Sequence, residues 1–334
     1  MQAVHNYVVT LPGGGEVLQC EMFGSGQYAF ITKGCRQIYT TDGSLDDYLF
    51  PDDVLQFQVL EGRYIAVRTL HALYAVDLEA GRQLLLFQQK HTNSPAVLVA
   101  SDARVFQGSV WAVVVQYSQL TQLAAVRYTP ADRSCRTYKF RMQQLQRIQT
   151  HVQLAPVVRD GQEHFYVIVK DEKASCTCMR FAVLQDRSGQ GVFNQKFATR
   201  LSGMQAGART TLLLRTGDHV LVGGGRMLYV YRFGELCAQD QVVRAARAVR
   251  LEGGDADALH VCACGDLVAL GAGHSVFVVG RDELLEGAGT VALEAICAGR
   301  FRYRHRVVGL QSSGRALHVA HQNRPEGPEP GPAA

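Results

Sequence analysis

The sequence is poor in lysine, asparagine and tryptophan. Lysine supplies six of the 34 basic residues, asparagine occurs four times, and Trp111 is the single tryptophan. A GC-rich coding sequence explains this bias most simply; the alternative is selection of arginine for bidentate or stacking contacts. The chain also lacks the polar composition of a disordered protein, because 47% of its residues are hydrophobic and 19% are charged. These values exclude a coiled coil as well and leave ample material for a core over 334 residues.

Strong net charge, long apolar runs and targeting patterns are also lacking. The net charge is +4, too small to predict nucleic-acid binding by itself. No apolar run reaches about 18 residues, so we expect no transmembrane segment. The N-terminus has no signal-peptide pattern, and Asn93-Ser94 is followed by Pro95, which removes the glycosylation acceptor. We therefore predict an intracellular protein, cytoplasmic or nuclear.

Metal-binding and disulfide patterns are missing from the nine cysteines. Their number is odd and no CxxC pair exists. The two close pairs, Cys176 with Cys178 and Cys262 with Cys264, have a spacing that puts both members on one face of a strand. We expect free thiols packed in a reducing compartment rather than a zinc site.

Catalytic and cofactor motifs are not found either. Glycine-rich residues 13–15, 223–225 and 271–273 lack the partners that complete a phosphate loop or a dinucleotide motif, and fit tight hairpin turns. The acid pairs at residues 46–47 and 52–53 fall in an expected exposed loop, and the histidines show no metal-ligand spacing. The sequence thus predicts no catalytic, cofactor or metal site, and a protein that is not an enzyme.

What the sequence does contain is a repeated hairpin pattern. Each copy has an apolar strand rich in Val, Tyr and Phe, a tight polar turn, and a second strand of alternating character. The copies are residues 28–42, 64–78, 111–129, 165–184, 219–233, 267–281 and 306–322. Their spacing of roughly 40–50 residues is typical of β-propeller blades.

Further strands on either side of each hairpin complete the predicted blades. The outer strand after the sixth hairpin is placed at residues 290–295. The seventh hairpin is followed by residues 323–334, a tail with four prolines that we expect to be disordered. The spare N-terminal strand, residues 5–11, is expected to pair into the last blade and close the ring. The predicted fold is all-β, a single propeller of seven four-stranded blades over residues 1–322.

One segment resembles a known repeat family. Residues 75–84 (AVDLEAGRQL) are similar to the strand–Asp–turn–Gly–strand segment of WD40-type repeats, with Val76 where the family has Trp, followed by Asp77 and Gly81. Residues 231–236 match the same segment more weakly. The Gly-His dipeptide of such repeats does not precede any inner strand of this sequence. The resemblance implies a degenerate WD40-like propeller, a kind of protein in which a rigid frame presents loops to partner chains.

A basic segment, residues 300–306 (RFRYRHR), leads into the last hairpin. On a strand its arginines would share one face and its aromatic residues the other. This pattern fits an amphipathic strand, or a basic stripe for an acidic partner, a phosphoinositide or an RNA backbone. The candidate contact residues in it are Arg300, Arg302, Arg304 and Arg306.

A second basic segment carries Arg244, Arg247 and Arg250 at the spacing of a helix face. Residues 241–251 and 141–149 are the two segments whose composition is compatible with a helix. The three arginines complete the set of candidate contacts.

The sequence therefore supports two functional hypotheses. The first is a non-catalytic propeller scaffold or adaptor, a subunit that binds other proteins within a larger complex. The alternative is a nucleic-acid-binding propeller in RNA processing that uses the basic stripe. The period and the lack of active-site motifs favour the first.

Overall fold

The computed structural model describes residues 3–9, 17–23, 27–88, 96–142, 145, 147–159, 161–171, 175–185, 191–204, 210–224, 226–238, 242–251, 259–304, 306–313 and 316–322. This part of the chain forms 28 strands and three short helices. The tail predicted at residues 323–334 lies outside it.

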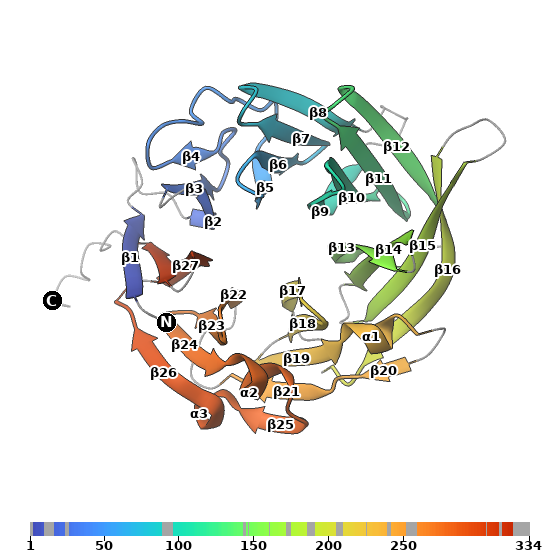
Figure 1. Ribbon diagram of the computed structural model, residues 1–334. Coiled ribbons are helices and arrows are strands. Elements are labelled where there is room, and N and C mark those ends of the chain that lie inside the picture. Colours follow the sequence, from blue (N-terminus) through green and yellow to red (C-terminus); the bar gives the residue numbers. More distant parts are fainter. Residues whose placement is uncertain are drawn as a thin grey trace, which may run out of the picture.

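The first half of the ring consists of antiparallel meanders with consecutive strands (Figure 1). The β2–β4 blade has β2 (Val17–Phe23), β3 (Gln27–Thr32) and β4 (Tyr39–Thr40), and the β5–β8 blade has β5 (Val54–Leu60), β6 (Tyr64–Thr69), β7 (Ala72–Asp77) and β8 (Arg82–Gln88). The β9–β12 blade has β9 (Val97–Phe106), β10 (Ser109–Tyr117), β11 (Thr121–Thr129) and β12 (Ser134–Arg141). The β13–β16 blade has β13 (Gln149–Arg159), β14 (Gln162–Asp171), β15 (Cys176–Gln185) and β16 (Gly191–Ser202).

The second half contains the three helices and two strands that pair outside their own hairpin. The β17–β21 blade has β17 (Thr210–Thr216), β18 (His219–Gly224), β19 (Met227–Arg232) and β21 (Arg247–Arg250), with α1 (Phe233–Leu236) after β19. In the same segment, β20 (Val242–Arg244) pairs with β16. The β22–β26 blade has β22 (Leu259–Cys264), β23 (Leu267–Ala272), β24 (Ser275–Gly280) and β26 (Cys297–Arg302), with α2 (Arg281–Leu285), β25 (Gly289–Ala292) and α3 (Leu293–Ile296) between β24 and β26. The final hairpin is formed by β27 (Arg306–Ser313) and β28 (Ala316–Gln322).

The N-terminal strand closes the ring, as predicted. Strand β1 (Ala3–Val9) pairs in parallel with β28, from Ala3 opposite Ala316 to Val9 opposite Gln322. Strand β27 lies in the innermost position and β1 in the third, so the two ends of the described chain share one sheet. Because the pairing covers the edge of β28, the last blade has no free strand edge at that position.

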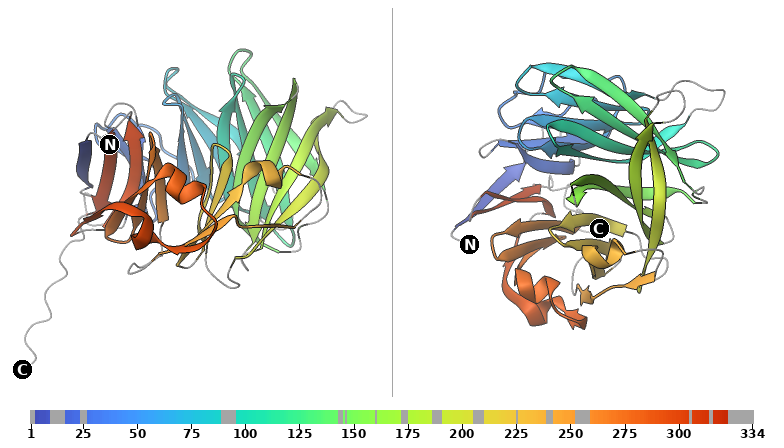
Figure 2. Two further views of the ribbon diagram at one scale, coloured as in Figure 1. Left: turned by 60° about the horizontal axis from the view of Figure 1, so that its bottom comes forward. Right: turned by 45° about the vertical axis from the view of Figure 1, so that its right-hand side comes forward.

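The predicted all-β, single-propeller fold is confirmed. The blades are arranged radially, and Figure 2 shows the strands of β9–β16 extending furthest along the ring axis. Hydrogen bonding joins the described strands into six sheets, because β12 pairs in parallel with β16 and links two meanders. The number of seven four-stranded blades stays a prediction, since two blades contain three described strands.

The hydrophobic core is divided into layers between neighbouring blades. One layer joins the β9–β12 and β13–β16 blades, where the ring centroids of Trp111 and Phe165 are 4.6 Å apart. In another, Tyr64 and Tyr128 join the β5–β8 and β9–β12 blades. Each further cluster likewise contains residues of two adjacent blades. These boundaries include the two on either side of the blade that contains β1. The ring is therefore stabilised by burial at the boundaries between blades.

The turn that resembles a WD40-type repeat has the structure its residues imply. Asp77 ends β7, is 1% exposed, and its Oδ1 accepts a hydrogen bond from the Ala80 N–H at 3.1 Å. Gly81 has a φ of +59°, a conformation that glycine adopts readily. This turn directs the chain from β7 into β8.

Three local predictions are wrong. Residues 290–295 are not the outer strand of the sixth blade: β25 pairs with β21 of the neighbouring blade, and β26 takes the outer position beside β24. Residues 241–251 form β20 and β21 instead of a helix, because both strands pair with existing sheets. The described residues between Arg141 and Gln149 contain no helix. Across the described residues, every helix is too short to cross a membrane.

Candidate binding surfaces

The arginines of residues 300–306 do not form one strand face. Strand β26 ends at Arg302 and β27 begins at Arg306. Between them the chain bends around the β23–β24 turn, since the Tyr303 N–H donates to the His274 carbonyl and the Val307 N–H to the Gly273 carbonyl, both at 2.8 Å. The predicted alternation holds on β26, where Arg300 and Arg302 are exposed and Phe301 is half-buried, but a single strand through Arg306 is not formed.

The four arginines of this segment consequently have different surroundings. Arg300, Arg302 and Arg304 are exposed. The Arg300 guanidinium donates to Ser275 Oγ at 3.3 Å and lies 4.8 Å from the Phe277 ring centroid, so it packs along its own sheet. Arg306 lies at the start of the innermost strand near His260, whose pKa falls to about 4 because of burial and of the Arg306 charge.

The arginines at positions 244, 247 and 250 do not share a helix face. Arg244 lies on β20 beside β16, whereas Arg247 and Arg250 lie on β21. Arg247 is 8% exposed and its guanidinium lies directly against Gly287, where a Cβ would collide with it. Arg244 and Arg250 are exposed. Whether any of the seven predicted arginines contacts a partner stays a prediction.

The cysteine pairs lie as their spacing predicts. Cys176 and Cys178 are both buried on one face of β15, and burial raises the pKa of each thiol, that of Cys176 to about 12. The described residues hold no cluster of three His, Cys, Asp or Glu side chains arranged around a common metal position.

The innermost strands are joined by a series of side-chain to backbone hydrogen bonds, which we name the inner belt. In each bond a Gln, Glu or Asp side chain accepts from a backbone N–H of the innermost strand of the next blade. The pairs are Gln311 with Met22, Glu21 with Val59, Gln58 with Ala103, and Asp102 with Leu154. On each strand, the residue that donates its N–H directly follows the residue whose side chain accepts the bond to the next blade; Met22, for example, follows Glu21. The bonds therefore keep one register around five blades.

Two features give the inner belt its chemistry. Burial raises the pKa of Glu21 to about 7, in spite of hydrogen bonds from Val59 and Gln19 that favour its charged form. Burial also raises the pKa of Asp102, opposed by Arg104, whose Nε lies 3.4 Å from Asp102 Oδ2. The belt reaches β13 at Gln153, whose buried Oε1 has no hydrogen-bond partner within the described residues.

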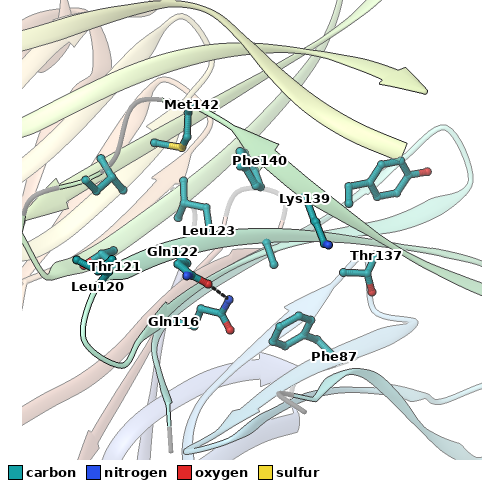
Figure 3. A pocket seen from close by; sticks show the side chains of 13 residues that line it. Phe87, Gln116, Leu120, Thr121, Gln122, Leu123, Thr137, Lys139, Phe140 and Met142 are labelled. Atoms are coloured by element: carbon teal, nitrogen blue, oxygen red, sulfur yellow. Dashed lines mark hydrogen bonds between the residues drawn. The ribbon is translucent and has the colours of Figure 1, made fainter. Parts of the chain in front are cut away.

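A groove opens where β12 leaves β11. The two strands pair from Thr129 opposite Ser134 to Ala124 opposite Lys139, after which β12 turns to pair with β16. The resulting cavity of about 450 Å³ is the β11–β12 groove (Figure 3). Its apolar lining comes from three adjoining segments and consists of Phe87, Leu120, Leu123, Phe140, Met142 and Leu145.

The polar part of this groove is small. Figure 3 shows Gln116 and Gln122 joined by a hydrogen bond of 3.0 Å beside Lys139, the one charged side chain of the lining. Leu120 lies in the β10–β11 turn and is 51% exposed. An exposed leucine at the mouth of an apolar groove is suited to binding and offers no acid–base pair for catalysis.

A second cavity, of about 570 Å³, lies at the boundary between the β13–β16 and β17–β21 blades. We name it the Arg215 pocket. Its walls include Tyr166 from β14, Arg215 from β17, and Phe233 and Cys237 at either end of α1. The pocket lies at the end of the β17–β21 blade where the first strand, β17, turns into the second, β18. The β10–β11 turn joins the second and third strands of its blade and therefore lies at the opposite end of that blade.

Sequence analysis missed both cavities. The residues of the Arg215 pocket come from segments far apart in sequence, and no spacing rule links them. One feature of the sequence could have indicated the β11–β12 groove: the apolar Leu120 lies within the polar turn segment Ser118-Gln119-Leu120-Thr121. Hydrophobic residues in hairpin turns are exposed by the geometry of the turn, so such a leucine marks a candidate contact.

Comparison with known proteins supports the fold, through matches to solved structures. No family model matches the chain, and no curated protein matches it. Solved structures do match. Kluyveromyces lactis Hsv2, with complete loop 6CD, aligns at a TM-score of 0.54 and 11% identity over 86% of each chain. BBS1N in complex with ARL6DN aligns at 0.53 and 12% identity over 92% of this chain and 87% of that one.

The fold of the chain is that of a β-propeller, and the predicted resemblance is confirmed at the level of the fold. The low identity limits these matches to the fold. One of the matching structures, BBS1N, was determined in complex with ARL6DN.

Proposed function

We propose that this chain is a non-catalytic scaffold, a subunit that binds other proteins within a larger complex. The β11–β12 groove is the observation that carries the proposal. It is apolar, open at Leu120, and formed on a frame held by interlocked sheets. A rigid frame with an apolar anchor site favours binding of a partner segment over chemistry.

The occupant of the groove is a segment of a partner protein that places an apolar side chain next to acidic ones. Strand β12 has Arg136, Lys139 and Arg141 exposed, and of these Lys139 lines the groove. From position 133 to position 159 the sequence contains no Asp or Glu. Acidic side chains beside the apolar anchor would be attracted by this field, which would also speed association.

The RNA-processing alternative depended on four arginines along one strand, which the fold does not form. It remains one outcome of the test below. The propeller domain over residues 1–322, the absence of catalytic activity and an intracellular location are parts of the same proposal.

The test compares the wild-type protein with Leu120→Glu and with Leu184→Glu as a matched control. The two leucines are 51% and 47% exposed, and Leu184 lies on β15 outside the groove. Each tagged protein is purified from its source cells with and without nuclease treatment, and co-purifying proteins are quantified. We expect partners that resist nuclease, are lost with Leu120→Glu and are kept with Leu184→Glu.

Two outcomes contradict the proposal. Equal partner binding by the two variants would remove the groove from it. A wild-type protein that brings down no other protein, or only proteins released by nuclease, would overturn the scaffold function and favour the nucleic-acid alternative.

A further inference from the structure

The Arg215 pocket has a charge pattern that points to a ligand. Arg215 is partly buried, its guanidinium carbon lies 4.2 Å from the Phe233 ring centroid, and its Nε is buried without a hydrogen-bond partner among the described residues. Burial lowers the pKa of Arg215, because a partly buried guanidinium is less well solvated than an exposed one. A cation held in this way gains from an incoming anion.

The inner part of the pocket is positive around one sulfur atom. Burial raises the pKa of the Tyr166 hydroxyl, and the neighbouring Cys237 thiol adds to that shift. The charges of Arg215, Arg159 and Arg180 all act to lower the pKa of the Cys237 thiol, although burial outweighs them and the net shift is upward. Of these arginines, Arg215 and Arg159 line the pocket, whereas the Arg180 guanidinium donates to His164 Nδ1 at 3.0 Å outside the lining.

The exposed part of the pocket lining carries three acidic side chains and two basic ones. These are Asp218, Glu235 and Glu286, with Arg159 and Arg232. Glu286 Oε1 lies 3.8 Å from His219 Nε2, and Glu235 Oε1 lies 3.8 Å from Arg232 Nη1. A ligand that enters past these side chains meets the acidic groups before it reaches the partly buried Arg215.

This order of charges distinguishes between kinds of anion. A polyanion such as an RNA backbone would bring further negative groups against Asp218, Glu235 and Glu286. A single carboxylate with basic side chains beside it would match both the interior and the rim. The planar guanidinium of Arg215 suits a carboxylate, because the two can form paired hydrogen bonds.

We propose that the Arg215 pocket binds a carboxylate of a partner protein, flanked by basic side chains, with Arg215 as the anchor. The inference rests on the proposed scaffold function and assigns it a second contact site, at a different blade boundary from the β11–β12 groove. The carboxylate comes from an Asp or Glu side chain or from a free C-terminus. Phe233 and Tyr166 supply the apolar walls against which the adjoining side chains pack.

The test begins with a selection of displayed random peptides of about a dozen residues on the full-length protein. One library has free C-termini and the other has its random segment placed internally, which separates the two sources of the carboxylate. We expect enriched peptides to share an Asp, a Glu or a free C-terminus next to Lys or Arg. Enrichment of peptides without this pattern, or no enrichment at all, would overturn the proposal.

An enriched peptide, labelled with fluorescein, is then titrated against the variants by fluorescence polarisation. We expect Arg215→Gln to weaken binding about tenfold or more and Arg215→Lys to weaken it less, since lysine keeps the charge without the planar fork. The matched control is Arg226→Gln, an exposed arginine of the same blade in the β18–β19 turn, at the other end of the meander. Equal losses for Arg215→Gln and Arg226→Gln would contradict the proposal.

Alkylation of Cys237 supplies a readout that does not depend on a variant. Wild-type protein is treated with N-ethylmaleimide with and without the peptide, and each cysteine is quantified by mass spectrometry. We expect the peptide to protect Cys237 and leave the exposed Cys135 unchanged. Unchanged labelling of Cys237 would place the peptide elsewhere and overturn the proposal.

Failure here is distinguishable from failure of the proposed function. If a partner co-purifies with the full-length protein and Arg215→Gln retains it along with the selected peptides, the scaffold function stands and the pocket assignment falls. If no protein partner co-purifies with the wild type, the scaffold function itself fails.

Discussion

The Glu21 carboxylate accepts a hydrogen bond from the backbone N–H of Val59 at 2.8 Å, across the boundary between two blades. Its other oxygen accepts from Gln19 Nε2 at 2.7 Å, and the Gln19 amide itself bonds to both backbone groups of Phe57. Three side-chain bonds of the same kind continue the inner belt on either side. A carboxylate held in such a position links the stability of the ring to pH.

Glu21→Gln should remove part of the pH dependence of folding. The pKa of Glu21 is raised from 4.5 to about 7, so between these values the folded chain binds a proton that the unfolded chain has released. The free energy of unfolding therefore falls as the pH rises from about 4.5 to about 7. Glutamine keeps the acceptor for the Val59 N–H without the charge, and we expect it to recover about 1–3 kcal/mol at alkaline pH.

Urea unfolding at a series of pH values measures this effect. Glu163→Gln, which changes an exposed carboxylate on β14, is the control. If Glu21→Gln and the wild type lose stability in parallel as the pH rises, the charge of Glu21 has no part in the pH dependence.

Asp102→Ala should destabilise the ring more than Asp102→Asn. Alanine leaves the Leu154 N–H without its acceptor at 2.7 Å and Arg104 without its partner at 3.4 Å. We expect a cost of about 2–4 kcal/mol for alanine and less for asparagine, which retains one acceptor oxygen. The measurement is urea unfolding, with Asp46→Ala at an exposed position as control. Equal stability of Asp102→Ala and Asp46→Ala would show that the inner-belt bond of Asp102 contributes nothing to the free energy of unfolding.

Sequence reasoning recovered those parts of the fold that depend on local pattern. The hairpins follow from short apolar strands and polar turns, and the closing strand follows from an unpaired N-terminal strand combined with a missing partner at the other end. Asp77 and Gly81 identified one turn correctly because both act within a few residues of each other. Each of these signals is carried by neighbours in sequence.

Most of the errors and omissions involve contacts between distant segments. The strand expected at residues 300–306 is interrupted by backbone hydrogen bonds to Gly273 and His274. The helical spacing of Arg244 and Arg247 was overridden by sheet pairing. The inner belt looks in sequence like the ordinary polar alternation of strands, because only the relative register of adjacent blades turns a glutamine such as Gln58 into a bridge to Ala103.

Deletion of residues 1–11 should destabilise the whole ring in one cooperative transition. The deletion removes β1 and leaves the edge of β28 unpaired. It also removes Val9, which is 6% exposed and packs in the cluster that contains Met22 and Val308. We expect the midpoint of thermal unfolding to fall by roughly 5–10 °C.

Circular dichroism on heating measures this transition. Deletion of residues 324–334, at the other end of the sequence, is the matched control, and we expect it to leave the midpoint unchanged. Identical melting of the two deletions would mean that closure by β1 contributes nothing to stability.

Phe193→Ala should loosen the boundary between the β9–β12 and β13–β16 blades. Phe193 is fully buried on β16, and its ring centroid lies 5.1 Å from that of Phe165 and 6.0 Å from that of Trp111. Removing the ring leaves a cavity among aromatic side chains that cannot collapse to fill it. We expect a cost of about 3–5 kcal/mol for alanine and clearly less for leucine, which refills most of the volume.

Trp111 makes this boundary observable, because it is the only tryptophan and is 2% exposed. Its fluorescence should move to longer wavelength at lower urea concentration in Phe193→Ala than in the wild type. Leu184→Ala, at a half-exposed position on β15, should change stability by no more than about 0.5 kcal/mol. If Phe193→Ala costs no more than this control, the aromatic cluster does not hold the two blades together, and the link between them comes from the pairing of β12 with β16 and from the Asp102–Leu154 hydrogen bond.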